Sequence, residues 1–339
     1  MTTDTLQSAK DLVRGFHAAF DAADDAQLAS VLATHTTSDY LWRGMHPFYE
    51  QRGATAVTDV FWLPLRHAMR SLQRREDVFM AGHNVVDDGK TVWVASMGHM
   101  MGLFDDDWAG IPATGKLAFL RYAEFHCVSE GKIVESAFFC DLLSIMHQAG
   151  CYPLPPPTAA TIIPQPGPRT HDGVMIDAQA PESGQKTMAL VHAMIDDLSN
   201  LNKTGLDHCP PQVLQKTWHE DMAWYGPVGI GATYTIARYQ QQHQYPFRTQ
   251  LKDKVFNGHI ARFAEGNYAG FFGWPNLTNT PTGGFLGLPG NDTRADMRVV
   301  DIYRRDGDKL AENWVFIDLL HWLSMQGLDL LARIRSQRA

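Results

Sequence analysis

Two aspartates, Asp141 and Asp318, stand at the ends of strand-like segments and could act as general bases. Side chains alternate between the two faces of a strand, so Asp141 shares its face with Phe139. Asp318 likewise shares a face with Trp314 and Phe316. An apolar environment raises the pKa of a carboxyl group, which makes its carboxylate a better base toward a carbon-bound proton. Each aspartate could instead cap the helix that follows it, a role that does not exclude catalysis.

The segments around the two aspartates are copies of one another. Residues 132–150 align with residues 309–327 at a constant shift of 177, and seven of these 19 positions are identical. Average composition would give about one or two matches by chance. Three further pairs occur in the same order: residues 42–44 with 224–226, residues 82–83 with 258–259, and residues 98–104 with 266–272. The chain is therefore predicted to contain two tandem copies of one module.

Each copy is predicted to begin with helices and to continue as strands. Apolar residues recur at helical spacing in residues 12–20 and 188–198. A further helix is expected over residues 54–72, with a counterpart over residues 236–242. Short strands are expected at residues 40–42 and 222–224, and longer strands at residues 91–101 and 119–128. This order favours an α+β module in which a curved, mostly antiparallel sheet packs on N-terminal helices.

The middle of the chain differs in composition from both copies. Residues 153–168 are rich in proline, which cannot sustain a helix or a central strand. We expect an extended linker over residues 151–182, a first module over residues 1–150 and a second over residues 183–339. The duplication further predicts that the two modules pack as an internal pseudo-dimer, and a homodimer is a further possibility.

The repeated pattern Lys-x-x-Glu-x-x-x-x-x-Asp-Leu-Leu, followed by a helix that ends on glycine, resembles the C-terminal signature of SnoaL-like polyketide cyclases. The sequence Gly-Ile-Pro-Ala-Thr-Gly-Lys at residues 110–116 resembles the loop before the penultimate strand of that family. His99-x-x-Gly102 resembles an upstream strand, and residues 42–44 and 224–227 resemble the first strand. The resemblance implies the nuclear-transport-factor-2-like fold, a cone-shaped α+β barrel with one deep apolar pocket in each module.

The resemblance also implies a cofactor-free reaction. In enzymes of the family, an aspartate removes a proton next to a carbonyl, and the enolate closes a ring by aldol addition. The catalytic residues implied here are Asp141, His99 and Asp318, with the pocket of His99 and Asp141 expected to be the active one. The expected substrate-binding residues are aromatic or amide side chains, namely Trp42, Trp224, Trp314, His46, His83, His259 and Asn267. Local packing or a surface position is the alternative for the histidines, and plain core for the tryptophans.

Three functions are open at this point. The favoured hypothesis is a SnoaL-like polyketide cyclase, or a related lyase or isomerase, acting on a hydrophobic carbonyl compound. One alternative is a non-catalytic module that binds a small ligand, since one fold serves many functions. The other is a hydrolase of the epoxide type, in which paired acids would activate water.

The composition argues against several other classes of protein. A formal net charge of -8 without basic runs disfavours nucleic acid as a partner, and no apolar stretch is long enough to span a membrane. The 15 histidines include no His-x-x-x-His or His-Glu-x-x-His pattern, and no glycine-rich nucleotide loop follows a strand. Neither a metal nor a cofactor is therefore expected. The N-terminus resembles no secretion signal, so a cytoplasmic location is expected.

Overall fold

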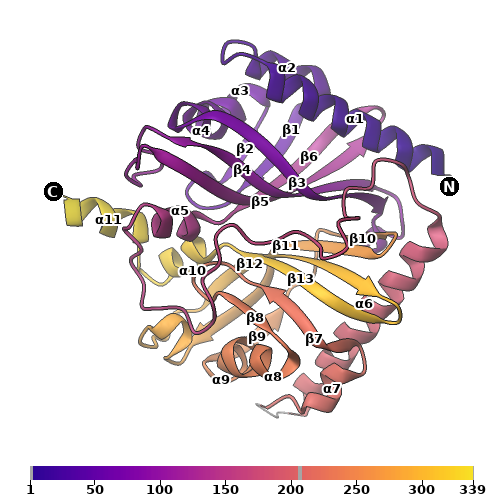
Figure 1. Cartoon of the computed structure of the whole chain (residues 1–339), viewed down its shortest axis with the longest axis vertical. Helices are drawn as coiled ribbons and strands as arrows, with labels where there is room; N and C mark the ends of the chain where they lie inside the picture. Colours follow the sequence, from indigo (N-terminus) through magenta and orange to yellow (C-terminus); the bar gives the residue numbers. More distant parts are fainter. Residues whose placement is uncertain (1–2, 205–207, 339) are drawn as a thin grey trace. The chain divides into compact units, whose positions relative to one another are not determined.

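The computed structural model describes residues 3–204 and 208–338, and it divides the chain into two compact units (Figure 1). The first unit comprises Met1–Pro153, Pro166–Ala178 and Asp329–Ala339, and the second comprises Leu154–Gln165 and Gln179–Leu328. The proline-rich segment is thus shared between the units. Its first part pairs with the second unit through Ala160 and Ala232, and its second part pairs with the first unit through Val174 and Phe79.

The first unit packs helices against one curved sheet. Its strands lie in the order β2-β1-β6-β5-β4-β3, with β1 and β6 parallel and the other neighbours antiparallel. Within the described residues this path does not close, so the sheet is open rather than a sealed barrel. The elements are α1 (Thr3–Ala22), α2 (Leu28–His35), β1 (Thr36–Gly44), β2 (Glu50–Arg52), α3 (Ala54–Val57), the π-helical η1 (Thr58–Trp62), α4 (Leu63–Ala68), β3 (Met69–His83), η2 (Val85–Asp87), β4 (Val92–Phe104), β5 (Lys116–Ser129), β6 (Lys132–Cys140), α5 (Leu142–Gln148) and α11 (Leu330–Arg338).

Helix α1 covers one face of this sheet. Val13, Phe16 and Phe20 recur every three or four residues and are buried, as expected for the apolar stripe of an amphipathic helix. The ring of Phe16 lies 5.8 Å from that of His126 on β5, and the ring of Phe20 lies 5.0 Å from that of Trp62. The face of β5 that carries residues 122, 124 and 126 therefore points toward the helices.

The second unit repeats the arrangement. Its strands lie in the order β10-β11-β12-β13-β7-β8, with β9 paired to β11 and with β7 parallel to β13. The α+β class and the two tandem modules predicted from the sequence are thus confirmed. The elements are α6 (Pro181–Lys203), α7 (Pro211–Gln215), β7 (Trp218–Tyr225), β8 (Ala232–Tyr234), α8 (Ile236–Tyr239), the π-helical η3 (Gln240–Gln244), α9 (Tyr245–Thr249), β9 (Leu251–Phe256), β10 (Ala261–Glu265), β11 (Tyr268–Pro281), η4 (Phe285–Gly287), β12 (Ala295–Asp306), β13 (Lys309–Ile317) and α10 (Leu319–Met325).

The helix expected over residues 54–72 is shorter than predicted. It ends at Ala68, and Met69 already pairs with Phe104 as the first residue of β3. Pro64 does not interrupt it, because the proline lies in the first turn of α4, where its missing N–H is not needed. The equivalent helical stretch of the second unit likewise consists of α8, η3 and α9, with Pro246 in the first turn of α9.

The strand register confirms the shift of 177 residues for β5 and β12 but corrects the alignment of the preceding strands. Gly98 pairs with Tyr122, and Gly273 pairs with Val299, which lies 177 residues after Tyr122. A Cβ at Gly98 would lie 1.9 Å from a backbone oxygen, and one at Gly273 would lie 2.0 Å from Asn276 Cβ. Both positions therefore require glycine. The counterpart of Gly98 is Gly273, not Gly266 as the sequence comparison predicted.

No helix among the described residues is both long and apolar enough to cross a membrane.

Candidate functional site

The second unit contains a cavity of about 320 Å³ between its helices and one face of its sheet. Alternate residues of β12 and β13 form one wall, as the two-residue period of a strand requires. Helix α6, strand β7 and the α8–α9 region form the other walls. The lining is mostly apolar and aromatic, and its residues include Met194, Ile195, Leu198, Trp224, Tyr239, His243, Phe247, His259, Phe271, Met297, Val299, Asp301, Tyr303, Asn313, Val315 and Ile317.

Asp301 is the sole carboxylate among the described residues that line this cavity, and no lysine or arginine accompanies it there. Tyr303 donates a hydrogen bond from its hydroxyl to Asp301 Oδ1 at 3.1 Å, and Asn313 donates from Nδ2 to the same oxygen at 3.3 Å. Asp301 Oδ2 has no donor within the part of the chain that the structure describes. Burial raises the pKa of Asp301 to about 6, although the hydrogen bonds from Asn313 and Tyr303 act in the opposite direction. This carboxylate has one oxygen anchored and one oxygen available.

An aromatic wall carries neutral polar groups into the same cavity. The ring of His243 stacks on Trp224 with centroids 4.0 Å apart, and Tyr239 lies 5.8 Å from Trp224. Burial lowers the pKa of His243 to about 3, so its imidazole is uncharged at neutral pH, and its Nδ1 has no hydrogen-bond partner among the described residues. Burial and the charge of Asp301 raise the pKa of Tyr239, which keeps the phenol protonated. The cavity thus combines one base with potential donors.

His259 occupies another wall of the cavity. Its ring stacks on Phe271 with centroids 4.0 Å apart. Burial, assisted by Arg262, lowers the pKa of His259 to about 3, and its Nδ1 has no hydrogen-bond partner in the described part of the chain. Of the histidines predicted to bind substrate, His259 is the one that lines this cavity.

The shift of 177 residues relates this site to the interior of the first unit. It places Glu124 at the position of Asp301, His126 at that of Tyr303 and Ser136 at that of Asn313. The first unit has no equivalent opening around its acid: Glu124 is 2% exposed and forms an ion pair of 3.1 Å with Arg74. Closely packed rings fill the neighbouring interior, namely Trp42, Phe61, Trp62 and Phe138.

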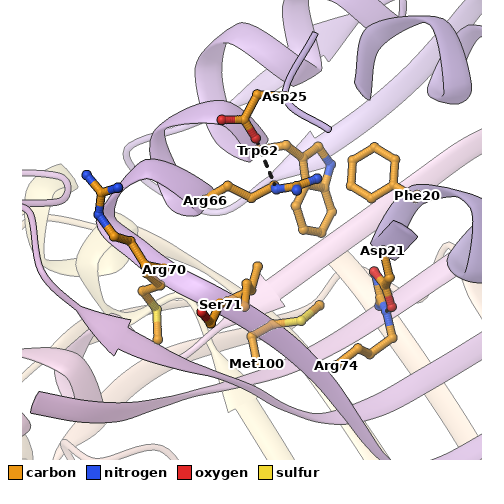
Figure 2. A pocket seen from close by; sticks show the side chains of 11 residues that line it. Phe20, Asp21, Asp25, Trp62, Arg66, Arg70, Ser71, Arg74 and Met100 are labelled. Carbon is orange, nitrogen blue, oxygen red and sulfur yellow. Dashed lines mark hydrogen bonds and ion pairs between the residues drawn. The ribbon is translucent and has the colours of Figure 1, made fainter. Parts of the chain in front are cut away.

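A second hollow, of about 520 Å³, lies on the first unit beside α1, α4 and β3 (Figure 2). Its charged side chains are already paired. Arg66 lies 3.3 Å from Asp25, and Arg74 lies 3.3 Å from Asp21. Because a ligand would have to displace these ion pairs, the hollow is a less suitable site for an apolar molecule than the cavity of the second unit.

Both aspartates predicted as bases are helix N-caps, which confirms the capping alternative. Asp141 Oδ1 accepts a hydrogen bond from Ser144 N at 3.0 Å, and Asp318 Oδ1 accepts one from His321 N at 3.2 Å. Asp318 also lies 3.4 Å from Arg298. Both belong to the sheet face that points away from the helices, since residues 313, 315 and 317 of β13 face the cavity. Their role as bases stays a prediction.

His99 and Asp141 share a face of the first sheet, but they do not lie on neighbouring strands. His99 pairs with Arg121 of β5, and Arg121 in turn binds Asp141 through the backbone. Two strand spacings of about 4.8 Å each therefore separate the two residues, with Arg121 between them. His99 Nδ1 instead lies 3.5 Å from a carboxylate oxygen of Asp77.

The predicted tryptophans fall into three different environments. Trp224 lines the cavity of the second unit. Trp42 is buried against Phe61 in the filled interior of the first unit. Trp314 stacks on Tyr225 at 5.7 Å, on the sheet face opposite the cavity.

The remaining predicted residues lie outside the cavity. His46 Nδ1 is 2.9 Å from the hydroxyl of Tyr49, and His83 is the last residue of β3. Asn267 lies in the turn between β10 and β11, where its Oδ1 accepts a hydrogen bond from Arg305 at 2.6 Å. The sequence analysis missed Asp301, although extending the gapless shift upstream would have paired it with Glu124.

No family model matches the sequence, and no curated protein matches it. Solved structures do resemble the chain. A candidate SnoaL-like polyketide cyclase from Jannaschia sp. CCS1 is 18% identical, with 44% of this chain and 94% of that protein aligned and a TM-score of 0.34. An NTF2-like protein from Burkholderia xenovorans LB400 is 13% identical, over 42% of this chain and 97% of its own, with a TM-score of 0.34. IdmH from Streptomyces antibioticus, a candidate polyketide cyclase, is 12% identical, over 42% and 99%, with a TM-score of 0.31.

The chain is thus similar in structure to SnoaL-like polyketide cyclases and NTF2-like proteins. Each match covers slightly more than two fifths of this chain and nearly all of the other protein, consistent with two tandem copies. At these identities the likeness concerns the fold and says nothing of the reaction.

Proposed function

We propose that the cavity of the second unit binds a flat, apolar carbonyl compound and that Asp301 removes a proton from the carbon next to its carbonyl group. The observation that carries this proposal is a single carboxylate in an apolar cavity, with a pKa raised to about 6 by burial and with Oδ2 facing no donor among the described residues. A base of this strength is still ionised at neutral pH, and it is about two pKa units more basic than an ordinary aspartate.

The reaction balances without a redox partner. The proton moves from the substrate carbon to Asp301 Oδ2, and the electron pair of the broken C–H bond moves to the carbonyl oxygen. The resulting enolate carbon either attacks a second carbonyl of the same molecule, which closes a ring, or takes a proton back at another position, which isomerises the substrate. Asp301 returns its proton to the new alkoxide or to carbon, so the enzyme is regenerated.

The developing enolate needs a hydrogen-bond donor, because its charge forms in a cavity with few polar groups. Tyr239 supplies a phenol that stays protonated, and the neutral imidazoles of His243 and His259 each offer an Nδ1 without a partner in the described chain. Tyr303 and Asn313 hold the carboxylate by its other oxygen. The aromatic wall of Trp224 and His243 suits a planar molecule.

The resemblance to polyketide cyclases supports the same class of reaction, although it implies Asp141 or Asp318 as the base. The cavity favours Asp301 over these two residues, because both cap helices and lie on the opposite face of their sheets. The epoxide-type hydrolase is less well supported, since the described lining offers one carboxylate where paired acids are needed. A binding module without turnover is the outcome that the following experiment separates.

A small bicyclic ketone, 2-tetralone, is a suitable probe because it has an acidic CH₂ between its ring and its carbonyl group. In D₂O, the protein is expected to accelerate deuterium exchange at this carbon, as followed by NMR. Asp301→Asn is expected to lose about 10²–10⁴-fold of the acceleration, the usual contribution of a general base. Asp141→Asn and Asp318→Asn serve as matched controls and are expected to retain it.

Equal exchange by the wild type and Asp301→Asn would refute the proposed base. Loss of exchange in Asp141→Asn or Asp318→Asn alone would return the assignment to the residue implied by the family resemblance. Binding of the ketone without any acceleration would favour the non-catalytic module.

A further inference from the structure

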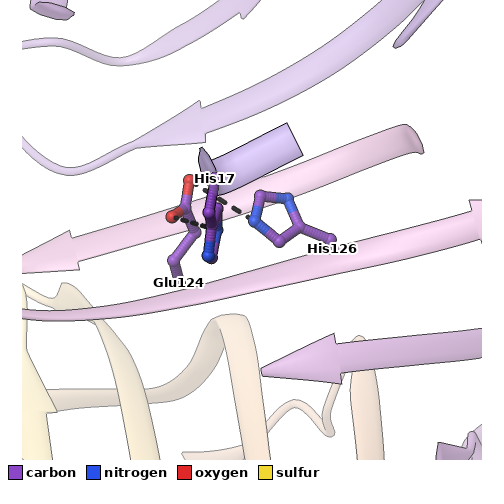
Figure 3. Close-up of side chains that lie close together, drawn as sticks. All are labelled: His17, Glu124 and His126. Atoms are coloured by element: carbon purple, nitrogen blue, oxygen red, sulfur yellow. Dashed lines mark ion pairs between the residues drawn. The ribbon is translucent and has the colours of Figure 1, made fainter. Parts of the chain in front are cut away.

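A cluster of two histidines and one glutamate lies buried in the first unit, between α1 and β5 (Figure 3). His17 is 6% exposed, His126 is 1% exposed and Glu124 is 2% exposed. The Nε2 of His17 lies 3.6 Å from one carboxylate oxygen of Glu124, and the Nε2 of His126 lies 3.6 Å from the other. One ligand atom from each residue lies within 4.8 Å of the other two.

Both imidazoles are oriented by their other nitrogen. His17 Nδ1 lies 3.3 Å from Glu76 Oε1, and His126 Nδ1 lies 2.7 Å from the hydroxyl of Ser136. Both Nε2 atoms are buried without a hydrogen-bond partner in the described part of the chain. A histidine held at Nδ1 by a carboxylate or hydroxyl, with Nε2 aimed at a shared point, is the arrangement that metal-binding histidines adopt.

We propose that His17, Glu124 and His126 bind one divalent transition-metal ion of the Zn²⁺ class. Two imidazole nitrogens and a carboxylate oxygen are ligands that Zn²⁺ accepts, at about 2.1 Å each. Two such ligands around a tetrahedral ion lie about 3.4 Å apart, close to the 3.6 Å separations in this cluster. Three protein ligands leave a fourth position for water.

The charges of the surroundings also suit a divalent cation. Glu76, Glu124 and Asp21 supply three negative charges, and Arg74, which pairs with Asp21 and Glu124, supplies one positive charge. With neutral imidazoles the cluster therefore carries a net charge of two negative units, which one divalent ion cancels. Buried charges of one sign are costly unless they are paired or bind a metal.

This proposal departs from the expectation of no metal site, which rested on spacing within single helices. The ligands come from two elements more than one hundred residues apart in the chain, α1 and β5, so a local motif could not reveal them. The second unit does not repeat the set, since Asp301 and Tyr303 stand where the first unit has Glu124 and His126. The site is therefore specific to the first unit and independent of the proposed catalytic cavity.

The test is metal binding by the full-length protein after treatment with a chelator. Zn²⁺ is titrated against a chromophoric competitor, and Co²⁺ is used to record ligand-field absorption. The wild type is expected to bind one ion per chain at micromolar concentration and to show a higher Tm with Zn²⁺. His17→Gln and His126→Gln are expected to weaken binding by more than about 100-fold, because even loss of an outer partner costs 10–100-fold. The exposed His67 provides the control, and His67→Gln is expected to bind normally.

X-ray absorption of the Zn²⁺-loaded wild type supplies a readout that needs no variant, and it is expected to show two imidazole ligands. Absence of binding at micromolar Zn²⁺ would overturn the proposal, as would equal affinity of the wild type and His126→Gln. A spectrum with fewer than two imidazoles would do the same. In those cases the cluster is an ion-pair network in which the histidines carry the compensating positive charge.

Discussion

Replacing Asp301 by asparagine is expected to stabilise the second unit at high pH while abolishing its chemistry. Burial raises the pKa of Asp301 from 3.8 to about 6. Between these two pH values the folded state therefore holds a proton that the unfolded state has lost. The free energy of unfolding falls as the pH rises through this window, because the folded state binds more protons than the unfolded state. Below about pH 3.8 both states are protonated, and the penalty vanishes.

The magnitude follows from the size of the shift. About two pKa units at 1.36 kcal/mol each correspond to about 3 kcal/mol of lost stability above pH 6. Asparagine has nearly the shape of aspartate, stays neutral and keeps an oxygen that can accept from the Tyr303 hydroxyl. Asp301→Asn is therefore expected to exceed the wild type in stability by up to about 3 kcal/mol near pH 8, and to match it near pH 3.5.

Hydrogen exchange of the amides in β12 and β13 measures this difference, because it reports on the second unit separately from the first. Asp308→Asn is the matched control: it removes the same charge from the exposed turn between these strands. Its effect is expected to stay within about 0.5 kcal/mol at both pH values. A stability difference between the wild type and Asp301→Asn that does not change with pH would refute the reasoning, since the carboxylate would then carry no burial penalty.

Three further outcomes are expected. Tyr239→Phe should reduce deuterium exchange of the ketone probe by about 10²–10³-fold with unchanged binding, the cost of one lost oxyanion donor; equal exchange would remove Tyr239 from the mechanism. Arg74→Met should destabilise the metal-free first unit by about 3–5 kcal/mol in urea unfolding, because it leaves Glu124 buried without its cation; a cost below about 1 kcal/mol would mean that the histidines already neutralise it. Asp141→Ala should cost about 0.5–2 kcal/mol through loss of the helix cap, measured by thermal unfolding.

The sequence predicted the architecture well because local patterns determine it. The helical spacing of Val13, Phe16 and Phe20 defines α1, and the 177-residue shift relates β5 and β6 to β12 and β13. The end of α4 was harder to predict, because Met69 belongs to β3 through pairing with Phe104 rather than through its own propensity. Pairing between distant segments is a tertiary effect that a local pattern does not contain.

The candidate site was only partly predictable. Trp224 and His259 line the cavity as expected, whereas the search for a base concentrated on strand ends and overlooked Asp301 in the middle of β12. A strand interior with alternating faces offers two possible environments, and the sequence does not reveal which face meets a cavity. Asp318 illustrates the difficulty, because its apolar neighbours on β13 belong to the face that points away from the cavity.

The duplicated acid shows how one position acquires two chemical characters. Burial acts to raise the pKa of both Glu124 and Asp301, but the surroundings decide the outcome. His126, His17 and Arg74 hold the pKa of Glu124 well below its usual value, so it stays a permanent anion and serves as a partner or ligand for cations. Asp301 meets only a phenol and an amide, so its pKa rises and it becomes a base. Carboxylates whose environments drive their pKa values apart take different roles, and here the exchange of His126 for Tyr303 accounts for much of the difference.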